Sequence, residues 1–353
     1  MTAPDILFVT RKWAPAVGGM ETWSMRLSEE LAKLALIEVV ALAGKSNGHP
    51  PGVLALLGFP FVVLRRLLAR ANTPDIMHLG DMALWPLALL ANRQTRIVLS
   101  AHGTDVSYAR RRTLRGRAYR AYLRVGAWLL REVAVTANSP ATAAAAREAG
   151  WANLAVVPLA TDITGAVPDH APQPHLLFAG RLVELKGCAW FIREVLPLLP
   201  QDLTLKVAGT GIEPAELAAL NHPRVEYLGP LDKDELAQAC RAALCVVVPT
   251  IEPANGSFEG FGLIAVEAAA AGGVVLAADC GGLPAAVRDG ESGILVRSGD
   301  PVAWQRTISD VSRWDSETRK RWIYAALAAV DQHYRWNRVA RQTLAAYGVS
   351  SKS

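Results

Sequence analysis

Residues 6–35 read ILFVTRKWAPAVGGMETWSMRLSEELAKLA and contain, in order, an apolar run, a glycine-containing turn and a helical pattern. The run Ile6 to Thr10 has the β-branched and aliphatic composition of a buried strand. From Glu21 to Ala35, apolar residues recur at the three-to-four spacing of one buried helix face: Trp23, Leu27, Leu31 and Leu34. The stretch predicts a strand, a turn and a helix, the repeating unit of a parallel α/β sheet.

Similar apolar runs, separated by helical patterns, recur along both halves of the chain. They are Ile37–Ala41, Ile76–Leu79, Ile97–Ala101, Val133–Ala137 and Leu154–Val157, then His175–Ala179, Leu203–Ala208, Val225–Leu228, Leu244–Val248, Gly273–Ala278 and Gly293–Val296. Near-continuous apolar strands that alternate with helices indicate parallel sheets covered on both faces, with right-handed crossovers.

The chain has 353 residues, which suggests two domains at roughly 100–200 residues each. A proline-rich stretch, Thr164 to Pro174, separates the halves and reads as a linker because proline continues neither element. We predict an α/β fold of two doubly wound domains, residues 1–165 and 166–335. Residues 336–353 are expected to form a helix that packs back on the first domain. Such sheets bind ligands at the carboxyl ends of their strands, which predicts a site in the cleft between them.

Composition indicates a cytoplasmic protein. The four cysteines show neither a disulfide framework nor a metal-ligand spacing, which favours a reducing compartment and predicts no metal site: Cys188, Cys240, Cys245 and Cys280. The N-terminus lacks the basic and apolar regions of a secretion signal. The longest uncharged apolar stretch near the front, Val53 to Leu64, has 12 residues, whereas a spanning helix needs about 20.

Positive charge is concentrated in the first half. Residues 1–165 carry 19 Lys and Arg against 11 Asp and Glu, a net charge of +8, whereas residues 166–353 have a net charge of −3. The segment Tyr108 to Arg131 holds eight arginines interleaved with apolar residues and no acidic residue: arginines 110, 111, 112, 115, 117, 120, 124 and 131. Together with the amphipathic stretch Val53 to Arg70, it predicts contact with an anionic membrane surface. A solvated helix is the alternative, and no nucleic-acid recognition motif is present.

Two motifs of the first half follow predicted strands, where a doubly wound sheet places its ligands. Gly18 and Gly19 lie between the first strand and its helix, and glycines there allow backbone N–H groups to approach a phosphate. A plain tight turn would have the same sequence. His102, in SAHGTD, follows the strand Ile97–Ala101, and a structural histidine is its alternative interpretation.

The second half places two cations after a strand. Gly180 and Arg181 end one predicted strand, and Lys186 follows five residues later. A planar guanidinium and a compact ammonium at this position suit a diphosphate, although a solvated surface pair gives the same pattern.

Residues 258–272, FEGFGLIAVEAAAAG, carry two carboxylates. Glu259 precedes a Gly-Phe-Gly turn, and Glu267 lies eight positions later in an almost wholly apolar helix. A carboxylate buried there without a partner costs several kcal/mol, so we expect Glu267 to accept hydrogen bonds. Sugar hydroxyls are suitable donors, and a structural salt bridge is the alternative.

Together these motifs resemble the retaining glycosyltransferases of family 4, also called glycosyl transferases group 1. The matching segments are GGME at 18–21, HGTD at 102–105, GRLVELKG at 180–187, and Glu259 and Glu267 with GFG between them. They occur in the order typical of the family and, with WNRVARQTLAAYG at 336–348, cover nearly the whole chain. The resemblance implies the GT-B architecture, two Rossmann-like domains facing across a cleft. It also implies transfer of a sugar from a UDP- or GDP-sugar to a glycan or lipid-linked acceptor in cell-envelope or exopolysaccharide biosynthesis.

The resemblance assigns roles by motif match. Arg181 and Lys186 would hold the donor diphosphate and neutralise its developing charge, Glu267 would accept the ribose hydroxyls, and His102 would contact the sugar on the acceptor side. The other donor contacts would come from Glu259 and the backbone of Gly260, Phe261, Gly262 and Leu263, with Gly180 beside the cations and Gly18 and Gly19 from the other domain. The resemblance implies no cofactor, no metal and front-face attack by the acceptor, so no catalytic nucleophile is assigned.

Other enzyme classes fit the same scaffold. A nucleotide-sugar epimerase and a non-catalytic nucleotide-sugar-binding subunit stay open, whereas an oxidoreductase should show a compact GxGxxG that is absent here. Two loops depart from the pattern that is usual in the family: residues 158–162, PLATD, where Asn-Gly is common, and residues 251–257, IEPANGS. Because both would border the sugar, the donor's identity is left open.

Overall fold

The computed structural model describes residues 3–16, 18–45, 51–211 and 213–348. These residues form two compact units. The first unit contains residues 1–159 together with 336–353, and the second unit contains residues 160–335. The chain passes from one unit to the other between Leu159 and Ala160, six residues before the end of the range predicted for the first domain.

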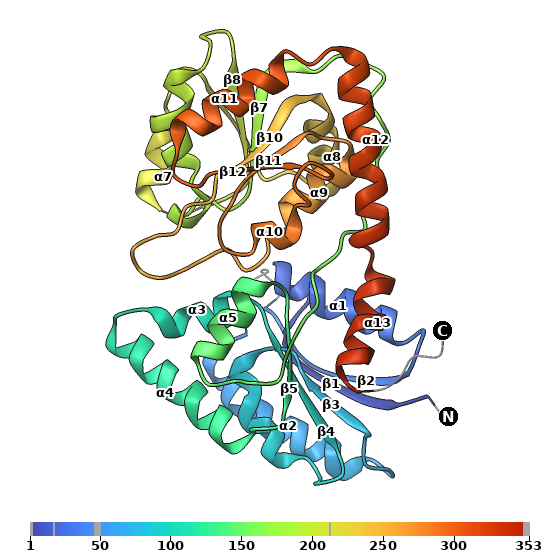
Figure 1. Ribbon diagram of the computed structural model, residues 1–353. Coiled ribbons are helices and arrows are strands. Elements are labelled where there is room, and N and C mark those ends of the chain that lie inside the picture. The colour runs from blue at the N-terminus through green and yellow to red at the C-terminus, as the bar shows by residue number, and fades with distance from the viewer. Residues whose placement is uncertain (1–2, 17, 46–50, 212, 349–353) are drawn as a thin grey trace. The chain divides into compact units, whose positions relative to one another are not determined.

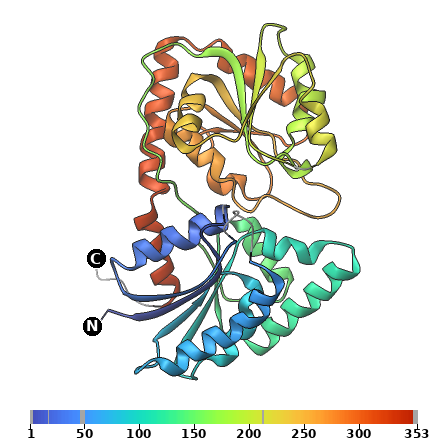
Figure 2. The same cartoon turned by 180° about the vertical axis from the view of Figure 1, so that it is seen from behind.

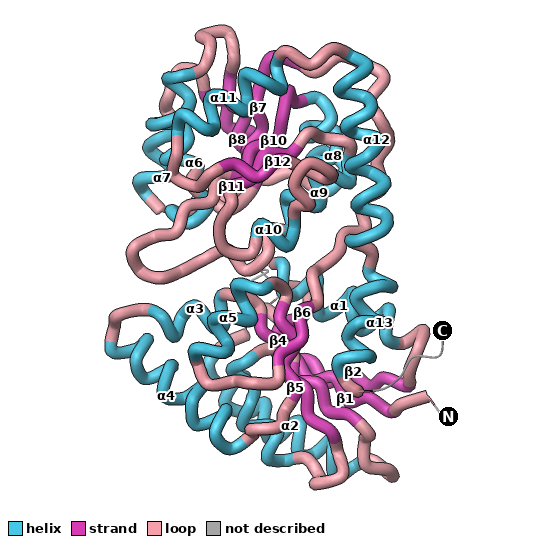
Figure 3. Tube along the Cα trace, viewed as in Figure 1, coloured by secondary structure: helices cyan, strands magenta, loops and turns pink. Residues whose placement is uncertain are grey.

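Each unit is built on a six-stranded parallel sheet (Figure 3). In the first unit the strand order is β2-β1-β3-β4-β5-β6, and in the second it is β12-β11-β10-β7-β8-β9. The strands of the first sheet are β1 (Asp5–Trp13), β2 (Leu36–Ala43), β3 (Ile76–Leu79), β4 (Arg96–Ala101), β5 (Ala134–Ala137) and β6 (Leu154–Val156). Those of the second are β7 (Gln173–Ala179), β8 (Thr204–Ala208), β9 (Val225–Gly229), β10 (Ala243–Val248), β11 (Val275–Ala278) and β12 (Ile294–Val296). The predicted α/β class is confirmed, and all twelve predicted strands are present.

Helices join consecutive strands of each sheet (Figures 1 and 2). The first unit has α1 (Gly19–Leu31), α2 (Val53–Ala69), η1 (Met82–Leu90), α3 (Thr104–Ser107), η2 (Tyr108–Arg110), α4 (Leu114–Leu129), α5 (Pro140–Glu148) and α13 (Trp336–Ala346). The second has η3 (Glu184–Lys186), α6 (Cys188–Trp190), η4 (Phe191–Val195), η5 (Leu196–Leu198), α7 (Pro214–Ala219), α8 (Lys233–Ala242), α9 (Leu263–Ala271), α10 (Leu283–Ala286), α11 (Pro301–Ser312) and α12 (Ser316–His333). No helix among the described residues combines the length and hydropathy needed to cross a membrane.

The core of the first unit follows the predicted pattern with one correction. Residues 6–9 of β1 are fully buried, and α1 covers them with Trp23, Leu27 and Leu31. Helix α1 ends at Leu31, so Leu34 lies beyond it and is 40% exposed. Its place on the buried face was therefore predicted wrongly, because the three-to-four spacing of apolar residues continued past the last helical turn.

The predicted linker extends two residues too far, because β7 begins at Gln173. Pro174 is the second residue of β7, although proline lacks the N–H group that a central strand normally donates. The pairing of β7 with β10 is irregular at this point, since Gln173 pairs with Ala243 and Leu176 with Cys245. The irregular register accommodates the missing donor.

Candidate functional site

In the second unit, the loop after β10 leads into α9 and brings a carboxylate to the start of that helix. Gly262 precedes α9 with a φ of 92°, a left-handed conformation that favours glycine, and a Cβ there would lie 2.4 Å from Leu283 Cδ2. No side chain caps the helix. The N-terminus of α9 therefore presents backbone N–H groups and the positive end of the helix dipole, which favour an anion.

Lys186 and Glu259, which are 73 positions apart in sequence, form an ion pair through Nζ and Oε2. Their side chains are only 15% and 14% exposed. Burial acts to raise the pKa of Glu259, but the Lys186 ammonium, the Arg181 guanidinium and the N–H group of Phe261 hold it below its usual value. Glu259 is therefore ionised at neutral pH.

Arg181 adds a second positive charge next to the ion pair of Lys186 and Glu259. It is exposed and close enough to Glu259 to lower that residue's pKa, yet it makes no ion pair with any residue that the structure describes. One carboxylate against two cations gives the cluster of Arg181, Lys186 and Glu259 a charge of +1. Such a cluster can bind a phosphate without a metal ion.

Glu267 lies on α9, and its carboxylate is half-buried. Burial raises its pKa, a shift that Lys233 and Lys186 oppose through their charge. Within the described residues, no hydrogen bond or ion pair reaches this carboxylate, so the structural salt bridge considered as an alternative is not present. The hydrogen-bond donors expected for Glu267 do not come from the described part of the protein.

In the first unit, His102 follows β4 and is held by two hydrogen bonds. Its backbone N–H group donates to Asp105 Oδ1 at 2.8 Å, and its Nε2 lies 3.1 Å from the Gly80 carbonyl oxygen. Because a carbonyl can only accept, Nε2 carries the proton. Burial lowers the pKa of His102 to about 4, so the ring is neutral at pH 7 and Nδ1 is a hydrogen-bond acceptor.

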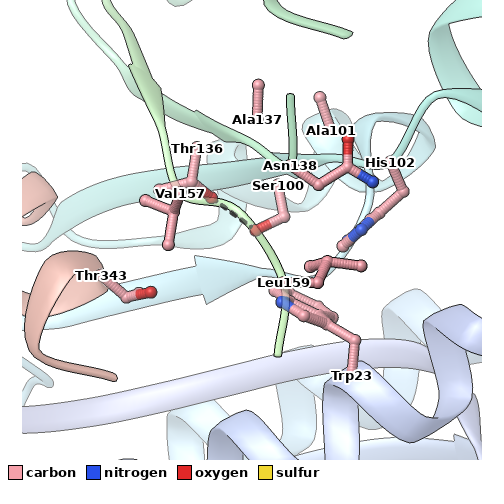
Figure 4. A pocket seen from close by; sticks show the side chains of 10 residues that line it. All are labelled: Trp23, Ser100, Ala101, His102, Thr136, Ala137, Asn138, Val157, Leu159 and Thr343. Atoms are coloured by element: carbon pink, nitrogen blue, oxygen red, sulfur yellow. Dashed lines mark hydrogen bonds between the residues drawn. The ribbon is translucent and has the colours of Figure 1, made fainter. Parts of the chain in front are cut away.

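A small pocket borders this histidine (Figure 4). The ring of Trp23 packs edge-on against His102, with centroids 4.2 Å apart. Polar groups that line the pocket come from the ends of neighbouring strands and from α13: Ser100, Thr136, Asn138 and Thr343. At about 10 Å³ the pocket has room for about one water molecule, so only a small polar group such as a single hydroxyl could enter it.

Gly18 and Gly19 lie at the N-terminus of α1, where they were expected. A Cβ on Gly18 would lie 2.5 Å from Glu21 Oε2, so the glycine makes room for a carboxylate in the first helical turn. Glu21 is buried and pairs with Lys12 Nζ at 3.3 Å. The helix end thus already contains an internal carboxylate, and the approach of a phosphate to these glycines stays a prediction.

Three charged residues near His102 were not expected from the sequence: Arg11, Asp81 and Asp105. Arg11 Nε donates to Asp81 Oδ2 at 2.7 Å, and Asp81 is fully buried at the end of β3. Asp105 accepts from His102 N and from Met82 N at 3.1 Å, which ties the ends of β3 and β4 together. Both carboxylates follow strands, so the rule that located His102 would also have located them.

The predicted residues thus form two groups, one in each unit. In the second unit, the N-terminus of α9 lies with Arg181, Lys186 and Glu259, and Glu267 lies further along the same helix. His102 lies with Trp23 in the first unit. Across the described residues, no three His, Cys, Asp or Glu side chains form a set that could hold a metal ion.

Solved structures of known proteins share this fold. The Anabaena protein HepE, solved with UDP and glucose, aligns over 98% of this chain and 99% of its own, with a TM-score of 0.73 and 20% identity. Sucrose-phosphate synthase from Thermosynechococcus elongatus aligns over 98% of both chains, with a TM-score of 0.77 and 20% identity. These likenesses support the GT-B class of two Rossmann-like domains.

Sequence relatives and family models agree with that fold. A D-inositol 3-phosphate glycosyltransferase from Nocardioides is 37% identical over 194 residues, 49% of this chain and 41% of the relative. The chain thus matches less than half the length of that relative. The model "Glycosyltransferase Family 4" matches residues 17–164, and "Glycosyl transferases group 1" matches residues 173–313. Because the two matches together cover most of the chain in the order of its two units, the chain belongs to glycosyltransferase family 4.

Proposed function

We propose that this protein transfers a sugar from a UDP- or GDP-sugar to a glycan or lipid-linked acceptor, with retention of anomeric configuration and without a metal ion. The observation that carries the proposal is the positively charged cluster of Arg181, Lys186 and Glu259 beside the uncapped start of α9. Cations and helix N–H groups converge there, as recognition of a diphosphate requires.

The proposed reaction needs no protein nucleophile. The acceptor hydroxyl oxygen attacks the anomeric carbon on the face from which the diphosphate leaves. The bond from that carbon to the phosphate oxygen breaks, and the hydroxyl proton passes to the departing phosphate. Arg181 and Lys186 stabilise the charge that grows on the leaving group. Glu267 accepts the ribose hydroxyls, which supply the donors that its half-buried carboxylate otherwise lacks.

The acceptor side is proposed to lie in the first unit. Neutral His102 offers Nδ1 to a sugar hydroxyl, and the pocket beside it is lined by hydroxyl and amide groups. The similar Nocardioides enzyme is named for an inositol phosphate, an anionic acceptor, and the first unit here is rich in arginine. We propose a role in cell-envelope or exopolysaccharide synthesis at the cytoplasmic side of the membrane.

The test is a donor screen followed by product analysis. UDP-glucose comes first, because HepE was solved with it, followed by other UDP-, GDP- and ADP-sugars. A ligand at 100 times its dissociation constant stabilises the folded state by about 2.7 kcal/mol, which a melting curve resolves. The proton coupling of the anomeric centre in the product then reports its configuration. An inverted product excludes retention, an epimerised donor indicates the epimerase, and no stabilisation by any nucleotide sugar rejects the proposal.

A further inference from the structure

Helix α2 presents an unusual outer face. Of its 17 residues, only Phe59 and Val63 are buried. On the opposite side, large apolar side chains recur at the spacing of one helix face, with exposed fractions of 86%, 66%, 74%, 36% and 77%: Leu54, Leu57, Phe61, Leu64 and Leu68. The stripe is about 20 Å long at 1.5 Å per residue. Single exposed apolar residues are ordinary, but a continuous stripe marks an interaction surface.

Helix α4 repeats this arrangement. Exposed apolar side chains follow one face at the same spacing: Leu114, Ala118, Ala121, Val125 and Trp128. Right-handed crossovers place α2 and α4 on one side of the first sheet, since both connect strands in the same direction across it. Both contact η1, whose Leu89 is 58% exposed. The two stripes therefore belong to one side of the unit, which we call the α2–α4 face.

The charged residues that α2 and α4 themselves carry are all arginines, although Arg66 of α2 pairs with Glu38 of β2. Neither α2 nor α4 contains an acidic residue. On α4, Arg117 and Arg124 lie seven residues apart along one edge of the stripe, and Arg115 lies on the other edge. None of these three has an acidic partner among the residues that the structure describes. Exposed leucine, phenylalanine and tryptophan beside unpaired arginines match an interfacial helix on anionic lipid.

Three other arginines of the segment, Arg110, Arg111 and Arg120, contact groups within the protein. Arg110 pairs with both carboxylate oxygens of Glu148 at 2.8 and 3.0 Å, and Arg120 donates to the Ala109 carbonyl at 2.8 Å. The guanidinium of Arg111 lies 4.8 Å from the ring centre of Tyr108. Both segments named from the sequence, Tyr108–Arg131 and Val53–Arg70, therefore contribute to the α2–α4 face, although Arg110, Arg111 and Arg120 contact other groups of the protein.

We propose that the α2–α4 face docks on a bilayer surface that contains anionic phospholipid. The apolar stripe of α2 enters the boundary between head groups and acyl chains, and the arginines of α4 contact lipid phosphates. The proposal deepens the membrane-side role included in the proposed function, and it does not depend on which sugar is transferred.

Vesicle flotation of the full chain tests the proposal. The vesicles contain phosphatidylcholine alone or phosphatidylcholine with phosphatidylglycerol, at low and high salt. We expect binding to the anionic vesicles and about tenfold weaker binding when Leu57→Ser and Phe61→Ser are combined, since two large side chains lose their burial. Combining Arg117→Gln and Arg124→Gln should remove most of the anionic preference and its salt dependence. The matched control is Val302→Ser with Tyr324→Ser, two residues of the second unit with exposed fractions of 49% and 65%.

Three outcomes would overturn the docking proposal. They are no flotation of the native chain, flotation that the α2 substitutions leave unchanged, and a dimer that these substitutions disperse in a chain that does not float. The last would assign the face to a second copy of the chain. Melting-curve shifts with UDP-sugars on the same variants keep the two proposals apart. Donor binding without flotation rejects docking alone, and flotation without donor binding rejects sugar transfer alone.

Discussion

Arg181 and Lys186 carry the same charge but differ in their surroundings. Arg181 is exposed and makes no ion pair within the described residues, so Arg181→Ala should leave the fold intact. We expect kcat/KM for sugar transfer to fall about 30- to 1,000-fold, equivalent to roughly 2–4 kcal/mol of lost transition-state stabilisation. The control is Arg288→Ala, which removes an exposed arginine paired with Glu291 in the same unit. It should not change turnover.

Lys186→Ala should lower both activity and stability. The substitution leaves the mostly buried carboxylate of Glu259 without its partner, which costs more than an exposed pair does. Urea denaturation should therefore show a lower free energy of unfolding for Lys186→Ala than for Arg181→Ala, whereas steady-state kinetics should show a lower kcat/KM for both. Turnover near the native value in both folded variants would contradict the assignment of the two cations to the diphosphate.

Replacing Glu259 or Glu267 with glutamine should have different effects on the stability of the protein. Glu267→Gln removes a half-buried charge whose pKa burial raises, so the free protein should become no less stable while its affinity for UDP and for the intact donor falls. Glu259→Gln breaks the pair with Lys186 and should destabilise the protein, and it should weaken the intact donor more than UDP. Calorimetric titration of both ligands, with melting curves, checks this. Equal losses for both ligands in both variants would refute the division of roles.

Strands were predictable from the sequence where helices cover both faces of the sheet. A strand covered on both sides is apolar throughout, which located the central strands. The edge strands β2, β6, β9 and β12 are only partly buried and were located by their short aliphatic runs, whereas the end of α1 and the start of β7 could not be located. Motif spacing located Lys186 and Glu259, but their pairing joins residues 73 positions apart and needs the folded sheet. The exposed face of α2 was also hidden, because an apolar helix pattern does not tell which stripe packs on the sheet.

Helix α13 is the element that completes the first unit. Tyr347, just after it, is fully buried, and its hydroxyl lies 2.5 Å from His78 Nδ1. His78 Nε2 lies 2.7 Å from Ser100 Oγ, which lies 2.8 Å from Thr136 Oγ1. Thr136 donates to the Leu99 carbonyl at 3.4 Å. Because this last oxygen only accepts, each earlier group must donate towards it, so Tyr347 donates to His78.

A chain that ends at Arg335 should therefore lose the first unit and keep the second. It lacks the buried Trp336, Val339, Leu344 and Tyr347, and at about 1.5–3 kcal/mol each their loss equals the whole stability of a typical domain. Limited proteolysis should leave residues 160–335 as the resistant fragment. A chain that ends at Gly348 keeps all these contacts and is the control. Equal resistance of both truncated chains would contradict the prediction.

Across the whole molecule, the two units differ in how buried ionisable groups make their stability depend on pH. In the first unit, burial lowers the pKa of His78 to about 3 and that of His102 to about 4, and it raises the pKa of Asp105 to about 7. The stability that the two histidines contribute is present above pH 6.5 and is lost as pH falls towards their folded-state pKa values. Asp105 has the opposite effect, because its folded carboxyl holds a proton above the pKa of the unfolded state. Because two histidines oppose one carboxyl, the free energy of unfolding of the first unit falls by about 1.4 kcal/mol for each pH unit below pH 6.5.

In the second unit the balance is reversed. Burial lowers the pKa of one histidine, His175, and raises the pKa of two carboxyls, Glu216 and Glu267. Against the effect of burial, Lys186 and Arg181 lower the pKa of Glu259, so the stability that this carboxylate contributes is lost only below the ordinary glutamate pKa of 4.5. A carboxyl with a raised pKa contributes stability at low pH that is lost as pH rises through its folded-state value. Mild acid should therefore not weaken this unit as it weakens the first.

The prediction is that acidification from pH 7 to about 5 makes the first unit unfold before the second. The cysteines make the two transitions separable, since all four lie in the second unit: Cys188, Cys240, Cys245 and Cys280. Three of them are buried, so their reaction with 4,4′-dithiodipyridine, which labels thiols in mild acid, reports unfolding of the second unit. Far-ultraviolet circular dichroism reports both units. As pH falls, a part of the dichroism should be lost at lower urea concentration while the buried thiols stay protected. Thiols that become reactive together with the first loss of dichroism at pH 5 would show that the acid-sensitive unit is not the one that carries His78 and His102.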